Sequence, residues 1–124
     1  MLAIRLNQYK TLTSEARAGF TSRMELHLRV HFEPVTNTLS SDQLREVIDR
    51  NWIKAEDYGL VSEFGICSFL NVIFTLGEEF EKQGHYPWAL PLLNDSTLTE
   101  ATKLNLLEAR VRDELKLAVK REDS

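Results

Sequence analysis

The sequence contains a single cysteine, Cys67, only three prolines, and no hydrophobic run as long as a membrane span. One cysteine excludes a disulfide framework within the chain and any metal site built from several cysteines. A membrane-spanning helix needs about 18 or more consecutive apolar residues, so we expect no membrane insertion. The first twenty residues carry four charged side chains and no apolar stretch. We therefore expect no signal peptide and a cytoplasmic protein.

The composition is otherwise that of an ordinary globular protein. The chain has 124 residues, of which 43% are hydrophobic and 27% are charged, and it fits one domain spanning residues 1–124. A net charge of -4 disfavours a general nucleic-acid binder. Residues 1–32 carry five basic and two acidic side chains, whereas residues 33–82 carry four basic and ten acidic ones. The acidic middle either complements the basic first helix or faces a basic partner.

The spacing of apolar residues predicts four helices and no strand. The first helix is expected from about Gln8 to His31, with Asn7 as its N-cap or with a later start at Ser14. Pro34 ends it, because the residue before a proline is pushed out of the helical region.

The second helix has a clear start and end. Ser40 and Gln43 form a capping-box pattern, and Gly59 suits a left-handed position after a helix that ends near Tyr58. The residues expected on its buried face are Leu44, Val47, Ile48, Trp52 and Ala55.

The third helix is expected from Phe64 to Phe80, with Ser62 as its N-cap. Its apolar residues fall on nearly every face, which is typical of a central helix covered on several sides. A strand is disfavoured, because the run is longer than the four to eight residues of most strands.

A structured loop, Gly84–Asn94, is expected to hold a short helical turn. The fourth helix starts near Thr99, and the residues on its expected buried stripe are Leu104, Leu107, Val111, Leu115 and Ala118. Residues 120–124 form a charged tail that we expect to fray. The prediction is an all-α fold: a single compact domain of about four helices around a central hydrophobic helix.

No pattern of residues predicts catalysis or a metal site. His27 and His31 are four residues apart, so they could reach one metal ion, but no third ligand or HExxH motif accompanies them. Cys67 lies in an apolar helix, where burial makes a thiol inert. The chain lacks a GxSxG elbow and a glycine-rich phosphate loop. We therefore predict no catalytic, cofactor-binding or metal-ligating residues, and no enzyme activity.

The candidate binding residues are an acidic cluster and two aromatics. Glu78, Glu79 and Glu81 lie at the expected end of the third helix, where the helix dipole disfavours negative charge. They form either a solvated helix end or a binding surface. Tyr86 and Trp88 follow on a proline-containing loop and belong to the residue types enriched at interface hot spots. Trp88 either plugs the end of the bundle or contacts a partner.

Several strings along residues 20–110 carry a family resemblance. They are HLRVHF (27–32), IKAEDYGL (53–60), LGEEFE (76–81) and YPWALPLLND (86–95). In these strings the chain resembles a family of small uncharacterised bacterial proteins encoded in type VI secretion gene clusters, beside effectors, spike proteins and adaptors. The resemblance implies no catalytic residues.

The function expected from this resemblance is a non-enzymatic protein-interaction module. It would be an accessory or adaptor protein that binds a type VI secretion effector or spike component. The alternatives are an immunity protein that neutralises a cognate toxin, and then a small enzyme or a regulatory domain. The expected partner is another protein, bound through Glu78, Glu79, Glu81, Tyr86 and Trp88.

Overall fold

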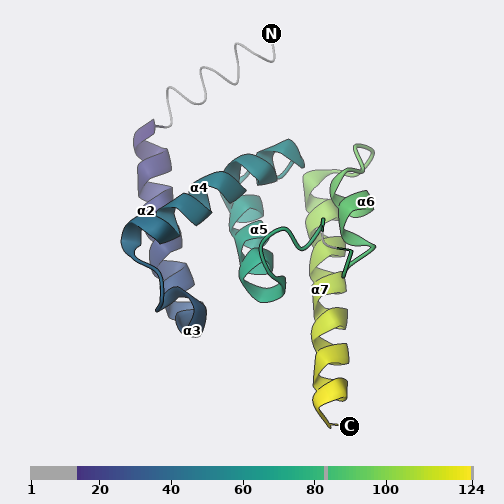
Figure 1. The fold of residues 1–124 in the computed structure, drawn as a ribbon. Helices are drawn as coiled ribbons and strands as arrows, with labels where there is room; N and C mark the ends of the chain where they lie inside the picture. The colour runs from purple at the N-terminus through teal and green to yellow at the C-terminus, as the bar shows by residue number, and fades with distance from the viewer. Residues whose placement is uncertain (1–13, 83, 124) are drawn as a thin grey trace. The chain divides into compact units, whose positions relative to one another are not determined.

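The computed structural model describes residues 14–82 and 84–123, and within them it contains helices and no strand. The helices are α2 (Ser14–His31), α3 (Glu33–Thr36), α4 (Ser41–Asp57), α5 (Glu63–Leu76), α6 (Ala89–Leu93) and α7 (Glu100–Asp123) (Figure 1). The prediction of an all-α fold is confirmed. The expected first turns from Gln8, and the Asn7 cap, lie outside the described residues.

The chain divides into two compact units, Met1–Arg50 and Asn51–Ser124. The division falls within α4, between Arg50 and Asn51. A single domain spanning residues 1–124 stays a prediction.

In the first unit, α2 ends at His31 as predicted, but the predicted reason is wrong. Phe32, with a φ of -130° and a ψ of 41°, is the residue that leaves the helical region, while Glu33 and Pro34 form the first turn of α3. A proline is tolerated there because the first amides of a helix have no intrahelical partner. Glu25 on α2 joins the start of α4, since its carboxylate accepts hydrogen bonds from Ser41 Oγ at 2.7 Å and Arg45 Nε at 3.0 Å.

The predicted helix boundaries around α4 are confirmed. Ser40 Oγ accepts from the Gln43 amide at 3.1 Å, and Gln43 Oε1 accepts from the Ser40 amide at 2.9 Å, which completes a capping box. After α4, Gly59 has a φ of 84°, a left-handed conformation that glycine adopts without a Cβ clash.

Helices α5 and α6 pack against α7 in the second unit (Figure 1). Ser62 caps α5 as predicted, since its Oγ accepts from the Gly65 amide at 2.9 Å. The buried apolar side chains of this unit include Ile66, Phe69, Leu70, Ile73, Phe80, Leu93 and Leu107. Six of the fourteen residues of α5 are buried, whereas Phe64 near its start is 71% exposed.

The predicted end of the third helix is wrong by one turn. Helix α5 ends at Leu76, because Gly77 takes a φ of 113° that an α-helix does not contain. Phe80 therefore reaches the core from a turn after α5 and not from the helix itself.

The predicted stripe on the last helix is buried only in its first half. Leu104 and Leu107 are buried, whereas Leu115 is 46% exposed and Ala118 is exposed. Helix α7 extends to Asp123, and fraying of this end stays a prediction. None of the helices in the described part of the chain is long and apolar enough to cross a membrane.

Candidate functional site

The acidic residues lie in a turn, residues 77–82, which we call the acidic turn. Backbone hydrogen bonds close it, from the Phe80 amide to Gly77 O at 3.2 Å and from the Lys82 amide to Glu79 O at 2.9 Å. Glu79 is exposed and has a φ of 64°. Among the described residues it is the only non-glycine with a positive φ.

Glu78 is half-buried beside Glu79. Its Oε2 accepts a hydrogen bond from Asn51 Nδ2 at 2.9 Å, and Asn51 is fully buried in α4. Glu78 therefore holds the acidic turn against α4, while part of its own surface stays exposed.

Glu81 is buried, so the prediction that it presents an exposed charge is wrong. Only 4% of the residue is exposed, and its Oε2 accepts from Tyr58 Oη at 2.7 Å and lies 3.3 Å from Lys54 Nζ. Burial first, and then the hydrogen bond to Glu81, raise the pKa of Tyr58 far above its usual range. The phenol therefore stays protonated and donates to the carboxylate.

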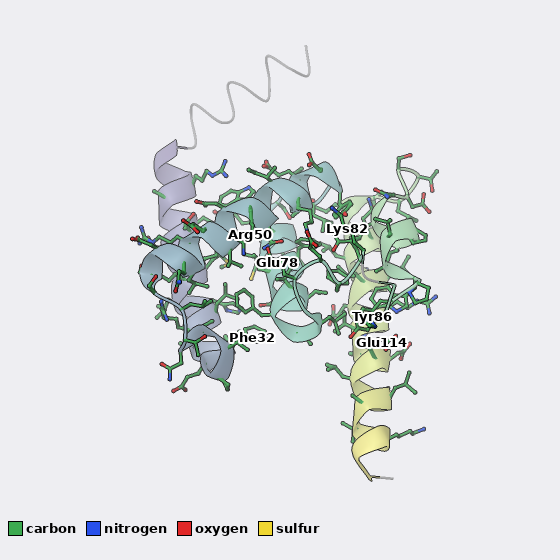
Figure 2. All side chains as sticks on the ribbon, in the orientation of Figure 1. Phe32, Arg50, Glu78, Lys82, Tyr86 and Glu114 are labelled. Atoms are coloured by element: carbon green, nitrogen blue, oxygen red, sulfur yellow. The ribbon has the colours of Figure 1, made fainter. Side chains whose placement is uncertain are left out.

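The aromatic residues form a connected cluster around Phe80. The Tyr86 ring lies 6.5 Å from the Phe80 ring and 5.9 Å from the Trp88 ring, measured between centroids. Trp88 Nε1 donates to Glu114 Oε1 at 3.0 Å, so a residue of α7 fixes the indole. Tyr86 comes from the loop before α6, and Glu114 from α7 (Figure 2). Tyr86 and Trp88 are both half-buried.

Lys103 fixes the C-terminal end of α6, the short helix that follows these aromatics. It is 5% exposed, and its Nζ donates to Tyr58 O at 2.7 Å and to Leu93 O at 2.8 Å. These two carbonyls lie at the C-terminal ends of α4 and α6, where a cation is favoured by the helix dipole. One buried ammonium therefore holds α4, α6 and α7 together.

The predicted site residues thus separate into two groups. Glu78, Glu79, Tyr86 and Trp88 have exposed surface and are linked through Phe80, whereas Glu81 faces the core. Sequence analysis missed the partners of this site, which are Asn51, Lys54 and Glu114. A possible signal was the i,i+4 spacing of Lys54 and Tyr58, which places both on one face of α4.

The other candidate residues are placed apart from this turn. Cys67 is half-buried, not fully buried as expected, and burial raises the pKa of its thiol. The rings of His27 and His31 lie 4.5 Å apart on α2. Within the residues that the structure describes, no group of three or more His, Cys, Asp or Glu side chains could hold a metal ion.

Comparison of the chain with known protein families, curated proteins and solved structures finds no match.

Proposed function

We propose that this protein is a non-enzymatic protein-interaction module whose binding surface consists of Glu78, Glu79, Tyr86 and the exposed part of Trp88. Its partner is an effector or spike component of a type VI secretion cluster, and its role is that of an accessory or adaptor protein. One observation carries the proposal: Glu79 is an exposed acidic residue whose backbone adopts a left-handed conformation.

The conformation of Glu79 is unfavourable for the fold. A non-glycine residue at positive φ loses roughly 1 kcal/mol or more relative to glycine. At the other positive-φ positions in residues 14–82 and 84–123, the chain has glycine: Gly59, Gly77 and Gly84. A glutamate at the tip of the acidic turn therefore works against stability, which supports a role in binding.

The aromatic cluster supports the same surface. Tyr86 rests on Phe80 and Trp88, and Glu114 fixes Trp88 through a hydrogen bond. An aromatic residue that is ordered before binding loses little conformational entropy when it meets a partner. Tyr86 would supply affinity, while Glu78 and Glu79 would attract a basic partner and speed association.

The test begins with capture of the partner from the native host with the whole chain as bait. Binding kinetics with the purified partner are then measured for Glu78→Lys/Glu79→Lys and for Tyr86→Ala. The charge reversal slows association in a salt-dependent way, and Tyr86→Ala speeds dissociation roughly 5- to 100-fold. Glu46→Lys is the matched control, because Glu46 is exposed on α4 in the first unit. Unchanged kinetics in both variants would refute this surface.

Glu79→Gly separates binding from folding. We expect it to raise the free energy of unfolding by roughly 1 kcal/mol, because glycine accepts the positive φ. The same variant should bind the partner more slowly. A variant that is more stable and binds equally well would show that Glu79 is not retained for binding.

The secretion role is tested separately in cells. An adaptor is required for delivery of the neighbouring effector, and its deletion leaves the producing cell alive. If expression of the neighbouring gene instead kills cells that lack this protein, the protein is an immunity protein and the adaptor role is wrong.

A further inference from the structure

Glu114 on α7 is a half-buried carboxylate with one oxygen in use. Its Oε1 accepts the hydrogen bond from Trp88 Nε1 at 3.0 Å. Within residues 14–82 and 84–123 no other donor reaches this carboxylate, and no cationic side chain forms an ion pair with it, not even Arg110 one helical turn earlier. A carboxylate that is partly withdrawn from water gains most from a cationic partner. Its Oε2 is therefore available to a charged donor from outside the chain.

Two aromatic residues, Trp88 and Tyr86, adjoin this carboxylate. Their ring centroids lie 5.9 Å apart, and both residues are half-buried, so each keeps some exposed surface. The buried Phe80 supports both rings, at 6.5 Å from each. Figure 2 shows Tyr86 and Glu114 in the same part of the second unit. One carboxylate and two aromatic rings thus meet at the Trp88 indole.

This combination favours a cation as the bound group. The face of an aromatic ring carries negative charge density, so it attracts a cation within about 6 Å. A guanidinium group fits best, because it is planar: its face can stack on a ring while its edge donates N–H groups to a carboxylate. The ammonium group of lysine is a compact, strongly hydrated charge without a face to stack. An acidic or purely apolar side chain would leave Glu114 with less water and no counter-charge.

We infer that Tyr86, Trp88 and Glu114 form a binding site for an arginine side chain of the protein partner. The guanidinium stacks on the exposed side of the Tyr86–Trp88 pair and donates a hydrogen bond to Glu114 Oε2. This site deepens the proposed function and rests on it, because it uses the same aromatic surface, specifies the residue that the partner presents and adds Glu114 to the binding residues.

The first test is an NMR titration of the full chain with the probe Nα-acetyl-arginine amide. The indole N–H of Trp88 is the reporter, because it donates to Glu114, and the indole N–H of Trp52, which is 5% exposed, is the internal reference. We expect a saturable shift of the Trp88 signal alone, with a dissociation constant of roughly 1–30 mM. The lysine analogue should bind roughly 3-fold more weakly. The citrulline analogue, which has the shape of arginine without its charge, should bind roughly 10-fold more weakly.

Glu114→Gln separates the charge of this side chain from its shape. The glutamine oxygen still accepts from the indole, so the Trp88 ring keeps its support, but the negative charge is lost. We expect the affinity for the arginine probe to fall roughly 5-fold or more. Glu108→Gln is the matched control, because Glu108 is an exposed carboxylate of α7 that lines a groove with α5 and not the aromatic cluster. It should leave the affinity unchanged, and circular dichroism checks that both variants keep their helical content.

Tyr86→Leu tests the aromatic part of the site. Leucine keeps an apolar side chain at this position but removes the ring face, and we expect the affinity for the arginine probe to fall roughly 2- to 5-fold.

The second test uses the purified partner. Glu114→Gln should speed its dissociation roughly 5-fold or more, whereas Glu108→Gln should leave its kinetics unchanged.

Three results would overturn the arginine site. The first is a Trp88 signal that does not shift with the arginine probe. The second is a citrulline or lysine analogue that binds as tightly as the arginine probe. The third is a Glu114→Gln variant that binds the probe and the partner as the wild type does.

These failures are distinct from a failure of the proposed function. If Tyr86→Ala and Glu78→Lys/Glu79→Lys weaken the partner while Glu114→Gln does not, the proposed surface stands and the arginine contact is wrong. If the probe binds through Glu114 while all of these variants leave the kinetics of the partner unchanged, the site takes arginine from another source and the proposed surface is wrong.

Discussion

At the scale of single residues, Glu81 decides how the acidic turn is attached to the rest of its unit. Its carboxylate pairs with Lys54 in the last turn of α4 and accepts a hydrogen bond from Tyr58 directly after that helix. A buried carboxylate is tolerated only where hydrogen bonds and an opposite charge replace water. Glu81 is therefore an anchor of the turn, and Glu78 and Glu79 are the acidic residues left for a partner.

Removal of the Glu81 carboxylate should destabilise the protein strongly. Glu81→Leu leaves Lys54 without its counter-charge and Tyr58 without its acceptor, and we expect a loss of about 2–4 kcal/mol in the free energy of unfolding. The double variant Lys54→Met/Glu81→Leu should recover part of this loss. Urea unfolding followed by circular dichroism measures both, with the exposed Glu79→Gln as the control, expected within about 0.5 kcal/mol of wild type. A Glu81→Leu variant as stable as this control would contradict the anchoring role.

Cys67 should react slowly in the folded protein. It is half-buried on α5, and burial raises the pKa of the thiol, so little reactive thiolate forms near neutral pH. We expect modification by a thiol reagent to be roughly 10-fold slower in buffer than in concentrated urea. Equal rates in the two conditions would show that the thiol is accessible and ionised in the native state.

At the scale of elements, α7 begins by capping α5. Glu100 Oε1 accepts from the Val61 and Ser62 amides, both at 3.0 Å, and from Ser62 Oγ at 2.8 Å. A Cβ at Gly65 would clash with this carboxylate oxygen. The junction between α5 and α7 thus requires a glycine inside the first turn of α5, at a position where helix propensity favours alanine.

The effect of Gly65→Ala on the free energy of unfolding should consequently depend on residue 100, and its sign should change when Glu100 is replaced. In the wild type we expect a loss of about 1 kcal/mol, because the displaced carboxylate gives up hydrogen bonds worth more than the gain in helix propensity. In a Glu100→Ala background the clash is absent, and the same change should stabilise the protein by about 0.5–1 kcal/mol. Thermal or urea unfolding of the four proteins completes the cycle. Equal effects in both backgrounds would rule out the coupling.

Local signals predicted the helix boundaries well. Each of these signals acts over three or four residues, so both partners of the interaction can be recognised in the sequence. Examples are the capping residues Ser40 and Ser62 and the glycine after α4. The end of α5 was predicted one turn late, because apolar spacing continues through Phe80 although Gly77 leaves the helix. Apolar spacing indicates which residues can be buried. It does not indicate whether another element arrives to cover them, as the exposed Leu115 shows.

The candidate site was predicted in part for the same reason. Tyr86 and Trp88 are close in sequence, so their association around one loop could be expected. The burial of Glu81 could not be expected, since its partner Tyr58 lies 23 residues away, directly after α4. Residue types alone do not distinguish an anchoring carboxylate from an exposed one. The prediction that three carboxylates form one surface was therefore wrong for one of them.

At the scale of the whole molecule, the chain divides into two compact units between Arg50 and Asn51, and each unit has its own polar anchor. In the second unit the anchors are the Glu81 cluster and the Lys103 ammonium. In the first unit the anchor is Glu25, whose hydrogen bonds from Ser41 and then Arg45 lower the pKa of its carboxyl. The stability that the Glu25 carboxylate adds to the first unit should therefore depend on pH, because a carboxyl with a lowered pKa stays charged at a pH where the unfolded chain already binds a proton.

The acid response of the first unit should depend on Glu25. Since its pKa is lower in the folded than in the unfolded protein, the carboxylate adds stability above its ordinary value of 4.5 and loses it as the pH falls through the folded value. Glu25→Gln should thus lower the free energy of unfolding by about 1 kcal/mol at pH 7. The difference should shrink steadily below about pH 4.5 and vanish once wild-type Glu25 is protonated. Urea unfolding of both proteins between pH 7 and pH 3 measures it, and Glu33→Gln, at an exposed position in the same unit, is the control. A difference between wild type and Glu25→Gln that stays constant with pH would show that the side chain stabilises the unit by its shape and hydrogen bonds and not by its charge.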